Sequence, residues 1–218
     1  MNPDVEASAA RLNAVLTSLD DEAARAPSGL PGWSRGHVLT HIANFSEAMT
    51  RQIDEARAGR QVEMYDGGRP ARDAAIEAGS GRSAEELRQH VREASDGLIA
   101  AWNKVDDWSL PVTHRNSDLA ATVYTGWREY EVHTVDLALG PTTDGWSEEF
   151  CLHLLDFLRP RTPDNLRLIL DAGNTRWENG TGQDRVLTGT LTDFTAWYAG
   201  RPPVRPITGD LPELNPWP

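Results

Sequence analysis

The stretch GWREYEVHTVDLALG, residues 126–140, carries the pattern that decides the fold of this chain. Its aromatic and branched apolar residues are typical of a helix that is largely buried. Glu129 and His133 are four residues apart and Asp136 follows three residues later. At about 3.6 residues per turn, the three side chains share one stripe of the helix. Such a stripe is compatible with a metal site, and equally with a simple hydrogen bond between Glu129 and His133.

A second segment, GWSRGHVLTHIANFSEAM at residues 32–49, contains His37 and His41, which are also four residues apart. The cores of helix bundles commonly house metals between facing helices. Two histidines and one glutamate, with one position left open, form a known catalytic zinc set. The spacing alone leaves both histidines as candidates, and it leaves a metal site and an ordinary helix contact as two open interpretations.

The remaining sequence before residue 140 is also helical in pattern. Amphipathic patterns cover residues 3–24, run from residue 34 past residue 49, and cover residues 83–105. The last of these opens with Ser83 and Glu86 in the spacing of a capping box. Together with residues 126–140 they predict a four-helix bundle. Residues 58–73 are rich in glycine and charge and are predicted to form a long loop, a kind of segment that often carries function.

The character of the sequence changes after residue 144. Short strand patterns separated by glycine-containing turns lie between residues 165 and 190, flanked by two short helical patterns. The tail over residues 201–218 contains six prolines and is predicted to be irregular. We therefore predict an α+β protein with two domains, a four-helix bundle over residues 1–144 and a smaller α+β domain over residues 145–218.

Composition restricts the partners and the location of the protein. With 33 acidic and 21 basic residues the net charge is −12, which repels nucleic acid and anionic membrane surfaces. Cys151 is the only cysteine, so an intrachain disulfide is excluded. No apolar run approaches the roughly 20 residues that a membrane helix needs. We expect a cytoplasmic protein that is a monomer or a weak dimer and binds neither nucleic acid nor membranes.

Four segments resemble one known family. GWSRGHVLTHIA at residues 32–43 and REYEVHTVDLALG at residues 128–140 resemble the two signature segments of the mycothiol-dependent maleylpyruvate isomerases, a branch of the DinB-like four-helix metalloenzymes. EMYDGGRPARDAAIEAGS at residues 63–80 and LTGTLTDFTAWYAGRPP at residues 187–203 point to the same branch. The resemblance covers nearly the whole chain and implies a DinB-like bundle followed by a small C-terminal domain.

Carried over residue by residue, the resemblance implies a set of metal ligands. The zinc ligands of the family fall on His41, Glu129 and His133. His37 lies one turn nearer the start of its helix and is expected to be exposed or to lie behind the ligands. Asp136 is expected to orient a ligand or to bind the thiol cofactor, the alternative being a carboxylate on the helix surface.

The resemblance also singles out two arginines. Arg72 matches the arginine of the long loop, and Arg201 matches the one after the last helix. The loop alignment needs one inserted residue, so Arg69 is a rival to Arg72. Planar guanidinium groups suit dicarboxylates, and we expect Arg72 and Arg201 to act in catalysis near the metal, by binding the substrate and stabilising the negative charge that develops on it. Arg201 is also expected to bind the cofactor.

The implied activity is the isomerisation of maleylpyruvate to fumarylpyruvate, a step of gentisate breakdown in aromatic degradation. A thiolate adds to the double bond, the new single bond rotates, and elimination restores the alkene and the thiol. Cys151 lies in an apolar pattern typical of a core, so the thiol is expected to be external. The resemblance implies that this thiol is mycothiol, activated by zinc or another divalent metal. The alternatives are a mycothiol S-transferase or related isomerase for another electrophile, and a non-catalytic thiol- or metal-binding module.

Overall fold

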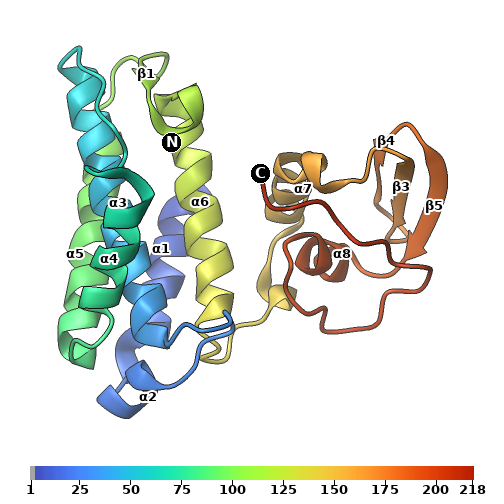
Figure 1. The fold of residues 1–218 in the computed structure, drawn as a ribbon, viewed down its shortest axis with the longest axis horizontal. Coiled ribbons are helices and arrows are strands. Elements are labelled where there is room, and N and C mark those ends of the chain that lie inside the picture. Colours follow the sequence, from blue (N-terminus) through green and yellow to red (C-terminus); the bar gives the residue numbers. More distant parts are fainter. Residues whose placement is uncertain (1–2) are drawn as a thin grey trace. The chain divides into compact units, whose positions relative to one another are not determined.

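The computed structural model describes residues 3–218. It separates into two compact units, one that ends at Gly140 and one that spans Pro141–Pro218. The first unit is built on four long helices that run alongside one another (Figure 1): α1 (Pro3–Val15), α3 (Arg35–Arg57), α5 (Ala84–Trp102) and α6 (Leu119–Asp136). The second unit contains the main sheet. The predicted α+β class, with an N-terminal bundle and a smaller C-terminal part, is confirmed.

The bundle core fixes the position of α6. Helix α3 packs against α5 and α6, and α1 packs against α6. Trp102 of α5 is fully buried, and its indole Nε1–H donates to the hydroxyl of Thr122 at 2.9 Å. A Cβ at Gly126 would lie 2.4 Å from the ring of Trp102. Glycine is therefore required at this position, because the indole lies directly on the backbone of α6.

Side-chain caps set the starts of α3, α5 and α6. The hydroxyl of Ser83 accepts from the backbone N–H of Glu86, and the Glu86 carboxylate accepts from Ser83 in return. The predicted capping box is confirmed. Asp118 caps α6 by accepting from the backbone N–H of Ala121 at 2.9 Å.

The first predicted helix is shorter than expected. It ends at Val15, and η1 (Leu16–Ser18) and a second short helix, α2 (Asp21–Arg25), follow. The break occurs because Leu19 is extended and the side chain of Asp20 accepts from Ala23 N–H at 2.8 Å, which starts a new helix.

The predicted loop over residues 58–73 is only half irregular. Helix α4 (Gly68–Gly79) begins inside it, and the single proline, Pro70, lies in the first turn, where its missing N–H costs no hydrogen bond. At the other end, a Cβ on Gly79 would lie 2.6 Å from the side chain of Thr40. This close approach packs α4 onto α3 and carries the loop sequence toward the face of α3 that bears His41.

A small hairpin lies directly before α6. Strands β1 (Pro111–Val112) and β2 (Ser117–Asp118) pair antiparallel around η2 (His114–Asn116). The Thr113 hydroxyl donates to Val62 O at 2.6 Å, and His114 N–H donates to the Gln52 side chain at 3.2 Å. These bonds tie the turn to α3 and to the loop that precedes α4.

The second unit has a three-stranded sheet. Strand β3 (Leu166–Asp171) is central, antiparallel to β4 (Arg176–Gly180) and parallel to β5 (Gln183–Thr188). Helices α7 (Glu148–Phe157) and α8 (Leu191–Tyr198) pack on each other, and α8 contacts β3. Short turns η3 (Thr143–Gly145) and η4 (Arg159–Arg161) flank α7.

The predicted irregular tail is held by specific contacts. Asp193 is fully buried and its Oδ1 accepts from the backbone N–H groups of Val204 and Arg205. Thr208 forms a bridge with Thr188 at the end of β5. Across residues 3–218, no helix is both long and apolar enough to cross a bilayer.

Candidate metal centre

Three side chains from two helices converge on one point in the bundle. His41 comes from α3, whereas Glu129 and His133 come from α6, and their ligand atoms all lie within 4.8 Å of one another. The Nε2 atoms of His41 and His133 lie 3.1 Å and 3.2 Å from the same oxygen, Oε2 of Glu129. The two imidazole rings are nearly perpendicular, at 88°. We refer to these three residues as the metal triad.

Packing between the helices holds the triad in place. The Ser46 hydroxyl of α3 and the Tyr130 hydroxyl of α6 form a buried hydrogen bond of 3.0 Å. His41 is buried, and the ring of Trp33 meets it edge-on at 5.8 Å. Both helices are thus locked in register at the level of the triad.

Asp136 supports the triad from behind. Its Oδ2 accepts from His133 Nδ1 at 2.9 Å, and its carboxylate is almost completely buried. With the proton on Nδ1, the Nε2 of His133 is directed toward Glu129, which is the arrangement that a metal-binding histidine needs. The backbone carbonyl of Asp136 also accepts from Gly29 N–H at 2.7 Å, which fixes the end of α6.

Burial and the hydrogen bonds among these residues shift the pKa values of all three triad side chains. Burial alone would raise the pKa of Glu129, but hydrogen bonds from His133 and His41 hold it well below its usual range. Burial alone would lower the pKa of His133, but its bonds to Asp136 and Glu129 raise it to about 9. Burial lowers the pKa of His41. An ionised carboxylate, itself partly exposed, therefore lies between two largely buried imidazoles.

The donor set fits a zinc ion. Two imidazole nitrogens and one carboxylate oxygen, with a buried carboxylate behind one histidine, are the ligands and the support that catalytic zinc prefers. Convergence of both Nε2 atoms on a single oxygen shows that the triad reaches one common point.

His37 has a different role from His41. Its Nδ1 lies 2.7 Å from the Ser34 hydroxyl and takes part in the capping box that starts α3. Its Nε2 lies 3.1 Å from Glu77 of α4. Both ring nitrogens are thus engaged away from the triad.

Arg72, and not Arg69, reaches the triad. Its Nη2 lies 3.3 Å from His41 Nδ1, and its Nη1 donates to Asp73 at 2.6 Å. The side chain of Arg69 is 89% exposed and lies 3.9 Å from Asp73. The unexpected helix α4 explains the difference, because it turns Arg72 toward α3.

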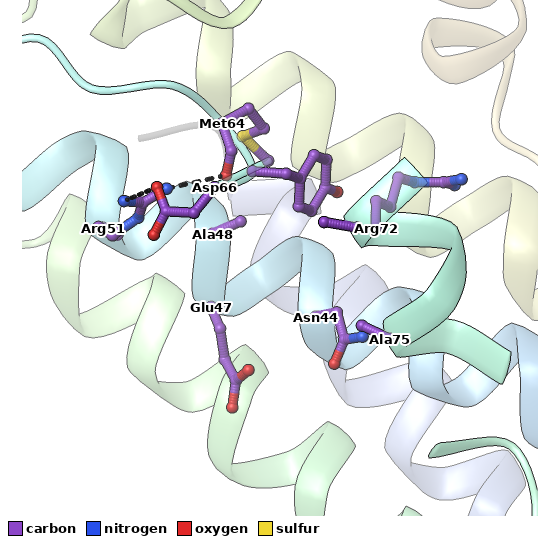
Figure 2. Close-up of a pocket in the computed structure, with 10 residues that line it drawn as sticks. Asn44, Glu47, Ala48, Arg51, Met64, Asp66, Arg72 and Ala75 are labelled. Carbon is purple, nitrogen blue, oxygen red and sulfur yellow. Dashed lines mark hydrogen bonds and ion pairs between the residues drawn. The ribbon is translucent and has the colours of Figure 1, made fainter. Parts of the chain in front are cut away.

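A pocket of about 370 Å³ borders Arg72 (Figure 2). Its walls come from α3, from α4 and from residues 64–66 of the preceding loop. Arg51 spans one end, where it donates to Asp66 at 2.9 Å. Tyr65 lines the pocket as well; burial raises its pKa, and the charges of Arg72 and Glu129 act on its hydroxyl.

Two further basic residues act on Glu129, and sequence reasoning did not find them. Burial lowers the pKa of Arg128 to about 10 and also lowers that of His114, while the charge of Glu129 opposes both shifts. Within residues 3–218, the buried Nε2 of His114 has no hydrogen-bond partner. Arg128 could have been noticed as the neighbour of a ligand. His114 could not, because its position depends on the turn bonded to Gln52.

Two family models match the chain. The family model described as the mycothiol maleylpyruvate isomerase N-terminal domain matches residues 5–138, and the one described as the MDMPI C-terminal domain matches residues 145–216. The chain belongs to the mycothiol maleylpyruvate isomerase family. The family predicted from the sequence is thereby confirmed.

Solved structures share the fold of this family member. The crystal structure of the mycothiol-dependent maleylpyruvate isomerase has 24% sequence identity and a TM-score of 0.87, covering 98% of this chain and 94% of that one. A mutant of that enzyme, with alanine in place of a histidine, gives the same values. No curated protein matches the chain.

The remaining expected residues of this family member lie in the second unit. Arg201 donates from Nη1 to Ala199 O at 2.6 Å, and its guanidinium lies 5.4 Å from the ring centre of Trp217. Its role at the metal centre stays a prediction. Cys151 is completely buried in α7, as expected for a core residue.

Proposed function

We propose that the protein isomerises maleylpyruvate to fumarylpyruvate with mycothiol as the thiol cofactor and zinc as the metal. The observation that carries this proposal is the convergence of His41, Glu129 and His133, backed by Asp136, within the segment that matches the family model. We further propose that it acts in the cytoplasm, where low-molecular-weight thiols are kept reduced, as a monomer or weak dimer.

The triad would hold the metal through His41 Nε2, His133 Nε2 and the Glu129 carboxylate. A zinc ion bound there lowers the pKa of a coordinated thiol, so that a thiolate is available at neutral pH. The thiol has to be external, because the only cysteine of the chain, Cys151, is completely buried in the second unit.

The hydrogen-bond network predicts how the two histidines respond to the metal. His133 already carries its proton on Nδ1, bonded to Asp136, so its Nε2 can bind metal once the second proton leaves. His41 accepts from Arg72 at Nδ1 and donates from Nε2 to Glu129. With a metal held on Nε2, His41 would carry its proton on Nδ1, where Arg72 could no longer donate. Arg72 is then available to a substrate carboxylate.

Positive charge around Glu129 supports an anionic substrate. The net charge of −12 disfavours the approach of a dicarboxylate, so the site needs local cations. Arg72 contacts His41, and Arg128, whose pKa of about 10 keeps it charged at neutral pH, interacts electrostatically with Glu129. These side chains can balance the carboxylates of maleylpyruvate and the negative charge that develops on its oxygen when the thiolate adds.

A turnover assay tests the proposal. Zinc-loaded protein is mixed with maleylpyruvate and mycothiol, and formation of fumarylpyruvate is followed by chromatography, with parallel reactions that lack the thiol or contain a chelator. We expect turnover only when thiol and metal are both present. A stable thioether in place of fumarylpyruvate would indicate the transferase alternative, and the absence of any product would refute an enzymatic role with this substrate.

A further inference from the structure

The pocket beside Arg72 has the size of a small-molecule site. Its volume of about 370 Å³ lies within the range of roughly 300–1,000 Å³ that ligand pockets commonly have. Small side chains create the space, since Ala48 on α3 and both Ala71 and Ala75 on α4 line it. Asn44 and Ala75 lie at one end, and the pair of Arg51 and Asp66 lies at the other (Figure 2).

The polar groups of the pocket suit a neutral ligand with many hydroxyls. Two carboxylates, Glu47 and Asp66, are balanced by two guanidinium groups, Arg51 and Arg72, so the lining has no net charge. A dicarboxylate or a phosphate would gain little from such a balance. Alternating donors and acceptors on a partly apolar surface are what a sugar or a cyclitol can bind.

These polar groups are held in place before any ligand binds. Arg51 donates to Asp66 at 2.9 Å and also reaches the backbone oxygens of residues 63 and 64. Glu47 accepts from His90 of α5 at 2.8 Å. Asn44, by contrast, makes no side-chain hydrogen bond within residues 3–218, so its amide retains its full capacity for a ligand.

Two side chains that line the pocket also interact with residues of the metal triad. Arg72 lines it and contacts His41 at 3.3 Å, and Tyr65 lines it while interacting electrostatically with Glu129. A ligand that extends from the triad past these two residues therefore enters the pocket. Asn44 lies one helical turn after His41 on α3, which places its amide on the same side of the helix.

We propose that this pocket binds the glucosaminyl-inositol part of mycothiol, while its cysteinyl sulfur is directed to the metal triad. This inference rests on the proposed function and adds to it the site that distinguishes mycothiol from simpler thiols. The glucosaminyl-inositol part is neutral and rich in hydroxyls, in agreement with the balanced charge of the lining. Asn44 provides an amide for hydrogen bonds, and the three alanines leave room for the rings.

Isothermal titration of the zinc-loaded protein with two thiols tests the inference. Mycothiol is compared with N-acetylcysteine, which has the same thiol end but lacks the two rings. We expect Ala75→Phe to weaken mycothiol binding at least about tenfold by filling the pocket, and to leave N-acetylcysteine binding unchanged. Asn44→Ala should weaken mycothiol binding roughly two- to tenfold, the loss of one hydrogen bond.

The neighbouring residue on α4 provides a matched control. Ala74 is exposed and does not line the pocket, so Ala74→Phe should bind both thiols as the parent does. Zinc content and circular dichroism establish that each variant is folded and loaded. Ala75→Phe with parental mycothiol affinity would overturn the inference, as would a parent that binds both thiols equally.

Turnover by the parent separates this inference from the proposed function. If maleylpyruvate is isomerised but Ala75→Phe leaves mycothiol binding intact, the pocket assignment is wrong and the proposed function stands. If mycothiol binding depends on Ala75 and Asn44 but maleylpyruvate is not turned over, the pocket assignment stands and the substrate assignment is wrong.

Discussion

At the scale of single residues, His37 and His41 show how neighbours on one helix acquire different roles. The two are one turn apart, yet His37 completes the cap of α3 whereas His41 meets Glu129. We predict that His41→Ala loses most of its zinc and that His37→Ala retains most of it. Elemental analysis of protein purified without added metal measures the difference, and the opposite order would show that the wrong histidine was chosen.

Asp136 is predicted to tune the affinity for metal without touching it. Its carboxylate accepts from His133 Nδ1 at 2.9 Å in a buried setting. Asp136→Asn keeps the shape but removes the charge that makes His133 a stronger ligand, so zinc affinity should fall about 10–100-fold. Competition with a chromophoric chelator measures it, and unchanged affinity in a folded variant would contradict this role.

Which site residues the sequence reveals depends on how they are spaced. Glu129, His133 and Asp136 can be recognised in the sequence because their spacing of four and three residues places them on one face of a single helix. His114 is not, since only the bond from its backbone to the Gln52 side chain places it near Glu129. The choice between Arg69 and Arg72 also needed the structure, because it depends on the direction in which α4 leaves its loop.

At the scale of elements, close approach decides where glycine is required. A Cβ at Gly126 would meet the buried indole of Trp102 at 2.4 Å, whereas a Cβ at Gly97, on the exposed face of α5, meets nothing within 4 Å. We predict that Gly126→Ala destabilises the protein by about 1–3 kcal/mol through overpacking, in spite of better helix propensity. Gly97→Ala should stabilise it by about 0.5–1 kcal/mol. Urea unfolding compares the two, and equal effects would show that Trp102 moves aside freely.

The connection between α8 and the C-terminal tail should depend on pH. Burial alone would raise the pKa of Asp193, but hydrogen bonds from Thr190, Arg205 and Val204 lower it. A lowered folded pKa means that this stabilisation is present above the unfolded value, about 4, and is lost as the pH falls through the folded value.

Replacing Asp193 tests this pH dependence. Asp193→Asn should cost about 1.5–3 kcal/mol at pH 7 and should lose less additional stability on acidification than the parent. Thermal unfolding of the whole chain between pH 7 and pH 3 measures both, with the exposed Asp164→Asn as control. Parallel curves for parent and Asp193→Asn would refute the coupling.

Helix α4 marks the limit of prediction for elements. Glycines and a proline over residues 67–70 are typical of a loop, yet the helix starts there because Pro70 falls in its first turn and Gly79 docks on Thr40. Local propensity was overruled by a tertiary contact. The long amphipathic helices needed no such contact to be recognised, because their apolar period is itself the signal.

At the scale of the whole molecule, the sequence predicts the class of fold better than the order of the sheet. Four segments with a helical pattern of apolar residues predict the bundle, and the change from helical to strand patterns after residue 144 separates the bundle from the sheet. The strand order β4-β3-β5 includes a parallel pair, β3 and β5, that is separated by β4 in the sequence. The periodicity of apolar residues within each strand does not indicate which strands pair. The same limit holds for any contribution of the C-terminal unit to catalysis, which has to be tested by mutation.

Arg201 provides that test. Maleylpyruvate is a dianion, the chain has a net charge of −12, and the triad already contains one carboxylate, so each further cation that contacts the substrate should strengthen its binding. We predict that Arg201→Ala lowers kcat/KM for maleylpyruvate about ten- to a hundredfold, the effect of losing a charge-assisted contact of about 1.5–3 kcal/mol, while zinc content stays at the parental level.

Arg176→Ala, at an exposed arginine on β4 of the same unit, makes the same change in net charge and should leave kinetics unchanged. Steady-state kinetics of the two variants at several salt concentrations decide the matter. A specific contact gives a loss confined to Arg201→Ala, whereas equal losses in both variants would show only a long-range effect of charge, and parental turnover in Arg201→Ala would exclude this arginine from the reaction.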